Sequence, residues 1–328
     1  MKRVLIVTLG ESPSVVTEAI DFLRGEGKRI DEVIMLTTID ALTQDAVDLL
    51  VKHIPKHYSG QTRARAISIE AYEDIDSEEA LIMFMSEACG VLRGYIKAGN
   101  EVYVSISGGR KTMSALMTLA VQFYGAKELF HIIVIDRELE EKSNITKLRH
   151  LDNGEKNKVL HPDPSKFKVI KMPFIGLFPW ISDIVSALKG ERKSKREIEE
   201  LLTSNNLVED GKLTPLGEIF LKIIDQVESN PPPRLEKPEI LIGKHHHQKE
   251  LYQIAQKLVN RISYVTRVRS IEWKAGKEKV QKEPPNKLKI YINTGKGYNL
   301  GFLLETTAET EGQLAAAAEE VKELLQKM

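Results

Sequence analysis

Cysteine is almost absent from this chain of 328 residues, in which Cys89 is the one thiol. A disulfide framework is therefore excluded, and a zinc site built on cysteine is disfavoured. Neither sign of charge is in excess, because 47 Lys and Arg residues balance 47 Asp and Glu residues. This balance argues against a protein that coats nucleic acid along its whole length, although it leaves room for a local basic patch.

Long apolar runs are also missing from the sequence. No stretch reaches the length of a membrane-spanning helix, and the apolar run at 4–9 is too short for a secretory signal and predicts a strand. We therefore expect a cytoplasmic protein with no membrane partner. The length predicts two or three domains, and a hydrophobic content of 42% is enough to build their cores.

From Met1 to about Phe174, short apolar runs alternate with amphipathic segments. Runs that are apolar along their length are typical of parallel strands covered on both faces, so we predict an α/β, Rossmann-like domain over residues 1–174. Ser12 is the predicted N-cap of the first helix, with Pro13 at its first position. The polar stretch 136–165 has no periodicity and predicts an insertion or a long loop. The predicted strands are 4–9, 32–38, 66–71, 101–107, 130–135 and 167–172, with helices at 14–23, 43–51, 77–98 and 111–124.

The sequence pattern of residues 175–229 predicts a connector helix and a winged helix-turn-helix. Thr214 is well placed to cap the last helix of this module. The predicted helix at 194–204 mixes cations and acids. Such a mixed face suits contact with solvent better than contact with the DNA groove. The run of three prolines that ends at Pro233 is the clearest linker in the chain. In order, the pattern reads apolar helix, charged helix and turn or small hairpin, at 174–188, 194–204 and 205–213.

The last predicted domain, residues 236–328, is a small basic α+β unit. Between Lys244 and Tyr298, 13 Lys and Arg residues stand against four Asp and Glu residues, with aromatic residues interleaved. Such a surface suits RNA, although the cations could equally form a dimer contact. The predicted elements are a strand at 239–243, a helix at 247–262, strands at 268–273, 288–293 and 298–306, and a helix at 309–327. The candidate RNA-binding residues are Arg267, Arg269, Lys274, Lys277 and Tyr298.

Two loops follow predicted parallel strands and are the candidate ligand site. The first spans residues 8–12 and the second residues 105–112. Ligands of open α/β sheets bind at the carboxyl ends of the strands, where the strand order reverses. In the second loop, Gly108-Gly109 lets the backbone approach a ligand, and the following helix start offers unpaired N–H groups beside two cations, which suits a phosphate. The alternative is a tight turn with two solvated cations.

Neither loop matches a known nucleotide fingerprint. The loops are not a Walker A motif or a GxGxxG sequence, so ATP hydrolysis and NAD chemistry are disfavoured and no cofactor is predicted. The histidine run 245–247 has no carboxylate or cysteine partner at ligand spacing, so we interpret it as a solvated helix start. We predict no metal site.

Two stretches resemble a known family. Val-Thr-Leu-Gly-Glu-Ser-Pro-Ser-Val-Val-Thr-Glu-Ala at 7–19 and Val-Ser-Ile-Ser-Gly-Gly-Arg-Lys-Thr-Met at 104–113 are similar to the two signatures of CRISPR-associated Rossmann-fold (CARF) proteins, in their ring-nuclease-like branch. Both stretches fall where that family has them, after the first and fourth strands. The resemblance covers about half of the chain, residues 1–174.

The resemblance implies a homodimer whose two sheets form one ligand cavity on the two-fold axis. The implied ligand is a cyclic oligoadenylate of four or six adenylates, the second messenger of type III CRISPR systems. Some CARF domains also cleave this ring, and the residues here that could stabilise the charge are Ser12, Arg110 and Lys111. By the same resemblance, the ligand contacts are Thr8, Gly10, Glu11, Ser12, Thr37, Thr38, Ser107, Gly108, Gly109, Arg110 and Lys111.

Three functions remain open from the sequence. We favour the first, a type III CRISPR effector in which the ring controls RNA cleavage by the C-terminal domain and ring cleavage serves as the off-switch. The outline of this C-terminal domain is similar to RelE-type ribonucleases. The second is a stand-alone, metal-independent ring nuclease, and the third is a transcription regulator that uses the winged helix. A HEPN ribonuclease is excluded, because no Arg is followed by His four to six residues later.

Overall fold

The computed structural model describes the chain except for residues 70–71, 191–194, 230, 232–233, 235, 244–246, 275–278, 294–298, 310 and 328. It divides into two compact units, Met1–Ile223 and Ile224–Met328. The finer boundaries expected near residues 174, 229 and 236 stay predictions. Among the described residues, no helix is both long and apolar enough to cross a membrane.

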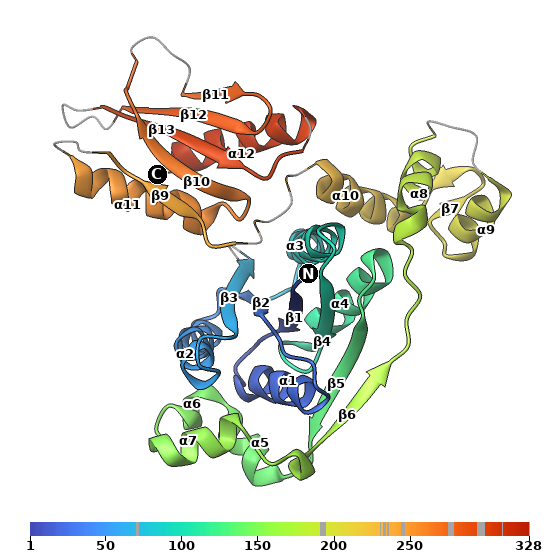
Figure 1. The fold of residues 1–328 in the computed structure, drawn as a ribbon. Helices are drawn as coiled ribbons and strands as arrows, with labels where there is room; N and C mark the ends of the chain where they lie inside the picture. Colours follow the sequence, from blue (N-terminus) through green and yellow to red (C-terminus); the bar gives the residue numbers. More distant parts are fainter. Residues whose placement is uncertain are drawn as a thin grey trace. The chain divides into compact units, whose positions relative to one another are not determined.

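A six-stranded sheet forms the centre of the first unit (Figure 1). Its order is β3-β2-β1-β4-β5-β6, and β1 pairs in parallel with both β2 and β4. The edge strand β6 runs antiparallel to β5. This arrangement confirms the predicted α/β, Rossmann-like fold with a mostly parallel sheet. The strands are β1 (Arg3–Thr8), β2 (Glu32–Thr38), β3 (Arg63–Ile69), β4 (Glu101–Ser105), β5 (Glu128–Val134) and β6 (Phe167–Met172).

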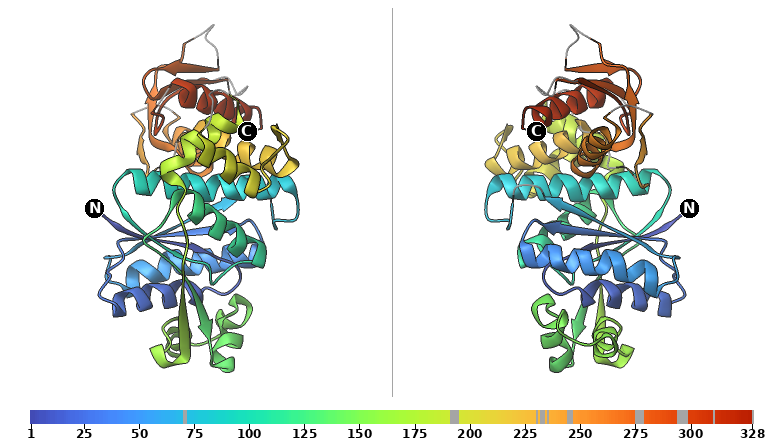
Figure 2. Two further views of the ribbon diagram at one scale, coloured as in Figure 1. Left: turned by 90° about the vertical axis from the view of Figure 1, so that its right-hand side faces the viewer. Right: turned by 90° about the vertical axis from the view of Figure 1, so that its left-hand side faces the viewer.

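Helices cover both faces of this sheet, as its apolar strands require. Figure 2 shows α1 (Ser14–Gly25) and α2 (Ala41–His57) on one side, and α3 (Glu78–Lys97) and α4 (Lys111–Tyr124) on the other. Every residue of β2 is buried, which fits a strand that packs on both faces. Ser77 caps α3, since its Oγ accepts a hydrogen bond from the Ala80 amide at 3.2 Å.

The start of α1 differs from the prediction. The helix begins at Ser14, after Pro13, and no side chain caps it. The expected cap by Ser12 is therefore wrong. Pro13 has a helical backbone conformation and occupies the capping position, so the chain has already turned before Ser12 could reach the helix.

The stretch between β5 and β6 is an insertion, as expected, but it contains helices rather than a plain loop. Each helix follows an Asp or Asn whose side chain accepts hydrogen bonds from the first backbone N–H groups: Asp136, Asn144 and Asp152. Good caps allow short polar helices that periodicity alone does not reveal. The helices are α5 (Arg137–Ser143), α6 (Ile145–Leu148), α7 (Asn153–Leu160) and the 3-10 turn η1 (Pro164–Lys166).

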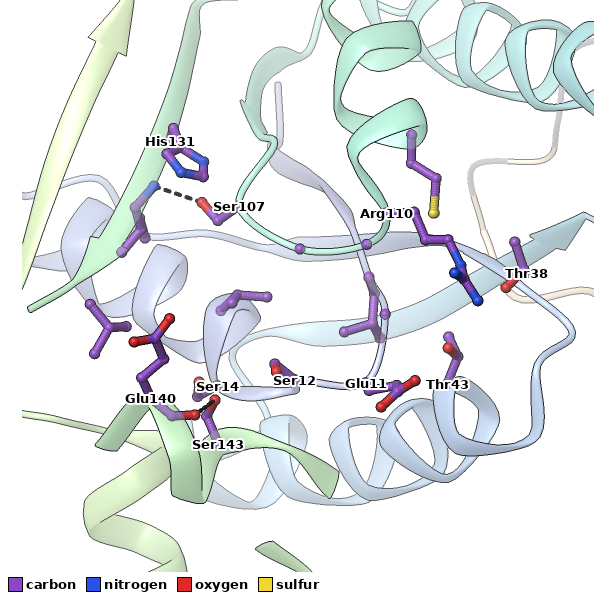
Figure 3. A pocket seen from close by; sticks show the side chains of 18 of the residues that line it. Glu11, Ser12, Ser14, Thr38, Thr43, Ser107, Arg110, His131, Glu140 and Ser143 are labelled. Carbon is purple, nitrogen blue, oxygen red and sulfur yellow. Dashed lines mark hydrogen bonds between the residues drawn. The ribbon is translucent and has the colours of Figure 1, made fainter. Parts of the chain in front are cut away.

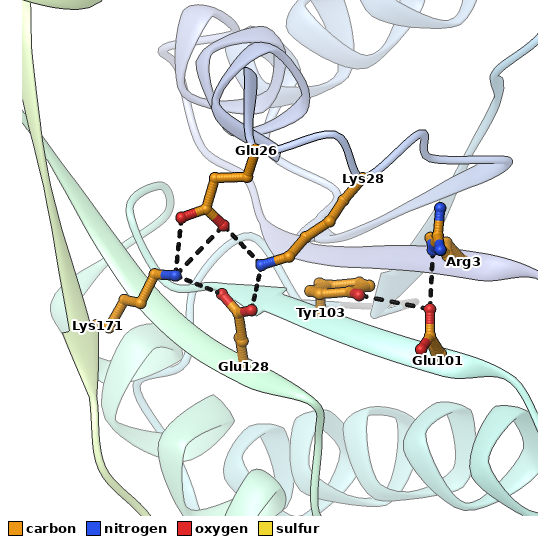
Figure 4. Close-up of polar contacts among 7 residues, drawn as sticks. All are labelled: Arg3, Glu26, Lys28, Glu101, Tyr103, Glu128 and Lys171. Carbon is orange, nitrogen blue, oxygen red and sulfur yellow. Dashed lines mark hydrogen bonds and ion pairs between the residues drawn. The ribbon is translucent and has the colours of Figure 1, made fainter. Parts of the chain in front are cut away.

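An ionic network lies at the amino-terminal end of β5, away from the two candidate loops (Figure 4). Lys28 and Lys171 both pair with Glu26 and Glu128, with Lys171 Nζ 2.8 Å from Glu26 Oε1. The network links the end of α1 to β5 and to the antiparallel β6. It therefore helps to hold the edge strand that follows the insertion.

A helix, a hairpin and a second helix follow the connector, in the order expected. The short 3-10 turn η2 (Phe178–Trp180) leads into the connector helix α8 (Ile181–Leu188). Thr214 caps the last helix, because its Oγ1 accepts a hydrogen bond from the Gly217 amide at 3.0 Å. A winged helix-turn-helix stays a prediction for this region. Its elements are α9 (Arg196–Ser204), the paired strands β7 (Val208–Glu209) and β8 (Lys212–Leu213), and α10 (Pro215–Ser229).

In the described part of the second unit, a five-stranded sheet of order β11-β12-β13-β10-β9 packs against two long helices. Alternate residues of β12 and β13, such as Leu288, Ile290, Phe302 and Leu304, join both helices in one core. The edge strand β11 was not expected, because its sequence Val-Gln-Lys-Glu lacks an apolar pattern. The elements are β9 (Glu239–Leu241), α11 (Gln248–Arg261), β10 (Val265–Ile271), β11 (Val280–Glu283), β12 (Lys287–Asn293), β13 (Asn299–Thr306) and α12 (Glu311–Lys327).

Candidate functional site

A pocket of about 500 Å³ lies at the carboxyl ends of the central strands. The loops after β1 and β4 form its wall, at the point where the strand order reverses from β1 toward β2 and toward β4. Helix α5 of the insertion contributes Glu140 and Ser143 to the same space (Figure 3). This is where open α/β sheets bind ligands.

Glycines allow the two loops to pack directly against each other. A Cβ on Gly108 would lie 2.4 Å from the Thr8 carbonyl oxygen and 2.8 Å from Val15 Cγ2. A Cβ on Gly10 would lie 3.1 Å from the Cα of Gly109, which has a φ of +77°. Larger residues would force the loops apart, so these glycines set the shape of the pocket.

Most of the residues predicted as ligand contacts line the pocket, and three do not. Thr8 and Thr37 are fully buried, so they lie behind the pocket surface. Lys111 is exposed at the first position of α4 and is outside the lining. The predicted residues in the lining are Gly10, Glu11, Ser12, Thr38, Ser107, Gly108, Gly109 and Arg110.

Hydrogen bonds from the neighbouring strands hold the second loop in place. Thr8 Oγ1 donates to the Gly108 carbonyl at 2.6 Å. Ser107 Oγ accepts from the Ile132 amide at 2.7 Å and lies 2.9 Å from Ser105 Oγ. The loop is thus tied to β1 and to β5, and no side chain caps α4 behind it. Its first N–H groups are therefore not committed to a cap.

Arg110 and several carboxylates line the pocket. Arg110 Nε lies 3.0 Å from Asp74 Oδ1, and 61% of the arginine side chain is exposed. Glu11, on the facing loop, accepts a hydrogen bond from Asn144 Nδ2 at 2.9 Å. Phosphate groups suit the glycine loop and Arg110, whereas carboxylates accept hydrogen bonds from hydroxyl or amino groups. The other carboxylates in the lining are Asp40, Glu73 and Glu140.

Several lining residues were not predicted. Asp40 lies two residues after the end of β2 and caps α2 through the Thr43 amide at 2.9 Å, so its position after a buried strand was an available signal. His131 lies on β5 and also lines the pocket. Glu140 and Ser143 come from a helix that the sequence pattern did not reveal. Only the tertiary fold brings α5 next to the first loop.

A buried carboxyl lies one helical turn from the pocket lining. Glu18 follows Ser14 on α1 and is 2% exposed. Burial, with the nearby Asp21 charge, raises the pKa of Glu18 from 4.5 to about 7. This side chain can therefore change its charge near neutral pH.

The model of the CRISPR-associated protein NE0113 family matches residues 12–207, which is more than half of the chain. The chain belongs to this family. The matched stretch begins in the first loop and includes the pocket lining except Leu9, Gly10 and Glu11, and it ends before the second unit. The NE0113 match thus supports the CRISPR-associated assignment of the first unit.

One curated relative is a ring nuclease. The chain is 29% identical over 157 residues to the CRISPR system ring nuclease SSO2081 of Saccharolobus solfataricus, an alignment that covers 45% of this chain and 80% of the relative.

Solved structures show more distant likenesses. Enterococcus italicus Csm6 bound to cyclic hexa-2'-fluoro-hexa-dAMP matches with a TM-score of 0.36 and 15% identity, over 70% of this chain and 55% of that one. The chain thus spans about half the length of that Csm6. A type III CRISPR defence DNA nuclease activated by cyclic oligoadenylate matches with a TM-score of 0.30 and 13% identity, over 69% of this chain and 33% of that one. These likenesses are too distant to carry an argument about function.

The candidate RNA-binding residues lie outside the NE0113 match. On β10, Arg267 Nε lies 2.6 Å from Glu239 Oε2 and its Nη1 lies 3.0 Å from Glu305 Oε2, so its charge is already paired. Arg269 and Lys274 are exposed. Lys277 and Tyr298 fall outside the described residues.

Proposed function

We propose that this NE0113-family protein binds a cyclic oligoadenylate in the pocket and cleaves it as a ring nuclease. The observation that carries the proposal is the pair of loops at the switch point, which pack against each other through their glycines. Arg110 and the uncapped start of α4 follow the second loop. The similarity to a ring nuclease over 157 residues supports it.

The pocket chemistry divides the ring between two kinds of contact. Phosphates would meet Gly108, Gly109 and the start of α4, where backbone N–H groups and the helix dipole favour negative charge. Arg110 adds a full positive charge. Glu11 and Asp40 would accept hydrogen bonds from ribose hydroxyls or adenine amino groups. The anionic phosphates have no hydrogen to donate to these carboxylates.

The size of the pocket favours a two-fold arrangement. A volume of about 500 Å³ lies within the range of pockets for drug-sized ligands, and a ring of four or six nucleotides is larger than such a ligand. Two copies of the pocket on a two-fold axis would match a symmetric ring of phosphates. A homodimer is therefore part of the proposal, and exposed Lys111 would contact the ring only in that assembly.

The cleavage step needs no metal. A ribose 2′-oxygen forms a bond to the adjacent phosphorus while the bond from phosphorus to the 5′-oxygen breaks. The 2′-OH proton leaves to a base, the 5′-oxygen gains a proton, and the strand ends in a 2′,3′-cyclic phosphate. Arg110, Lys111 and Ser12 would stabilise the charge on the phosphorane, and the loops would hold the in-line geometry.

The direct test is incubation of the full chain with labelled cyclic tetra-adenylate and cyclic hexa-adenylate. We expect one ring to be converted to linear products, and we expect Arg110→Ala to slow this by about 100-fold or more, as for other charge-stabilising groups. Arg29→Ala is the matched control, because Arg29 is similarly exposed and pairs with Asp31 away from the pocket. Recovery of intact rings, with no binding by calorimetry, would contradict the proposal.

A second candidate is a ring-controlled RNA effector. The observation that favours it is the outer face of the second sheet, where Arg269 and Lys289 flank Leu303 across three paired strands. RNA loss that occurs only when a ring is present would support this function. Ring loss with RNA intact would favour the stand-alone ring nuclease.

A further inference from the structure

Three histidines from two distant parts of the sequence meet near the carboxyl end of α2. His53 and His57 are four residues apart on this helix, so they lie on one face, one turn apart. His161 directly follows α7, more than 100 residues later. The insertion thus brings a third imidazole to a pair that the helix already presents.

The three rings are close enough to share one ion. One ring nitrogen of each histidine lies within 4.8 Å of the others. The Nε2 atoms of His53 and His161 are 2.8 Å apart, and the rings of His57 and His161 stack at 3.5 Å between centroids. Nitrogen ligands around a tetrahedral zinc lie about 3.3 Å apart, so His57 and His161 must rotate out of their stack for each ring to point one nitrogen at a common ion.

A carboxylate orients the central histidine. Asp21 Oδ2, on α1, lies 2.7 Å from His161 Nδ1, and the Tyr58 hydroxyl donates to Asp21 Oδ1 at 2.6 Å. A carboxylate that accepts from one ring nitrogen leaves the other nitrogen with its lone pair for a metal. For His161 that nitrogen is Nε2, which faces His53.

The surroundings combine a shielded side with an open one. The side chain of His161 is 10% exposed, whereas His57 is exposed and leaves a path for an ion and a water ligand. His53 is also partly buried, so the shielded side holds two of the three rings.

We propose that His53, His57 and His161 bind one divalent transition-metal ion of the zinc class, with Asp21 as a positioning residue. Three imidazoles with an open fourth position suit Zn²⁺ and its neighbours rather than Mg²⁺ or Ca²⁺. None of the three histidines lines the ligand pocket, so the site is separate from the one described above. The proposal does not depend on ring cleavage.

The ion would fasten the insertion to the body of the first unit. Leu148, Val159 and Leu160 of the insertion already pack together, with Leu49 of α2 against them. The same insertion supplies Glu140 and Ser143 to the pocket, and the Ile145 amide donates to the Glu11 carbonyl at 2.7 Å. A metal at His161 would therefore stiffen one wall of the pocket from outside.

The test is metal binding by the full chain after removal of bound ions with a chelator. Titration calorimetry with Zn²⁺ should give one site, and Co²⁺ should give the visible absorption of a four-coordinate ion. His57→Ala, an exposed position, and His53→Ala should each weaken binding by about tenfold or more, and Asp21→Asn by about 10-fold to 100-fold. Far-UV circular dichroism in chelator checks that each variant is folded.

Two controls isolate the site. His150→Ala removes an exposed histidine of the same insertion and should leave binding unchanged. Replacement of His245, His246 and His247 by Gln should also leave the site intact. The proposal is overturned if the wild-type chain binds neither ion, if both α2 variants bind as well as wild type, or if binding disappears with the 245–247 run.

Discussion

At the switch point of the first unit, the absence of a side chain on a single residue shapes the pocket. Gly108 has no side chain, and this lets the Thr8 carbonyl and Val15 approach its Cα. Thr8 is too deeply buried to line the pocket, yet it holds the Gly108 carbonyl. Thr8 therefore shapes the pocket without lining it, whereas Gly108 both shapes the pocket and lines it.

Gly108→Ala should separate the two loops. The added Cβ would meet backbone at 2.4 Å, a contact that only a shift of the loop can relieve. We expect a loss of about 1–3 kcal/mol in the free energy of unfolding, together with loss of ring binding. Gly25→Ala is the control, because open space surrounds that position. Urea unfolding and calorimetry measure both effects, and wild-type ring affinity in Gly108→Ala would contradict the pocket assignment.

Glu18 predicts a pH-dependent stability. Its pKa is raised by burial to about 7, so the folded state favours the protonated form. The associated stability is complete below pH 4.5 and is lost as the pH rises from 4.5 to about 7.

The neutral variant Glu18→Gln should escape this loss. Relative to wild type, its free energy of unfolding should rise by up to about 3 kcal/mol between pH 4 and pH 8. Urea unfolding of both proteins at each pH measures the difference, in which other titrating groups cancel. A difference that does not change with pH would show that the pKa of Glu18 is the same in the folded and the unfolded protein.

At the scale of elements, the insertion between β5 and β6 matters most. Its short helices exist because Asp136, Asn144 and Asp152 cap them. Asn144 has a second role, since its Nδ2 donates to Glu11 in the first loop. The insertion therefore acts as part of the pocket wall, although its sequence looks like a plain polar loop.

Asn144→Ala should affect stability and ligand affinity together. Loss of the α6 cap should cost about 0.5–2 kcal/mol, and loss of the bond to Glu11 should weaken ring binding by about fivefold to tenfold. Asp152→Ala removes the matching cap from α7, which does not line the pocket. We expect a similar stability change there with normal ring affinity. Equal affinities in both variants would mean that Glu11 does not need Asn144.

At the scale of the whole molecule, the chain joins a pocket-bearing unit to a second unit outside the NE0113 match. The second unit is rich in cations, but Arg267, Lys287 and Lys289 already pair with carboxylates. Exposed Arg269 and Lys274 are the better probes of RNA binding.

Arg269→Glu should distinguish the two candidate functions. If the second unit binds RNA, the charge reversal should weaken RNA binding by about tenfold at low salt, and the difference should shrink as salt rises. Ring cleavage should stay at the wild-type rate, whereas Arg110→Ala should show the reverse pattern. Filter binding with labelled RNA and the ring assay measure both, and unchanged RNA binding in Arg269→Glu would argue against this face.

Much of the first unit could be predicted from sequence. Apolar runs such as Glu32–Thr38 predicted buried parallel strands, and that strand has the predicted bounds. The paired motifs predicted loops after the first and fourth strands, because backbone-approaching glycines and strand ends are local features. Where the local signal was weak, the prediction failed: β11 is a charged edge strand, and the α5–α7 helices depend on their caps rather than on periodicity.

The sequence by itself determined the alternation of strands and helices, the two glycine loops and the cations that accompany them. Only the tertiary structure decided which side chains share a space. It buried Thr8 and Thr37, brought Glu140 and Ser143 to the pocket, and set His161 beside His53 and His57. The reason is physical: local patterns fix how each segment folds, but contacts between segments far apart in sequence depend on how whole helices pack on the sheet.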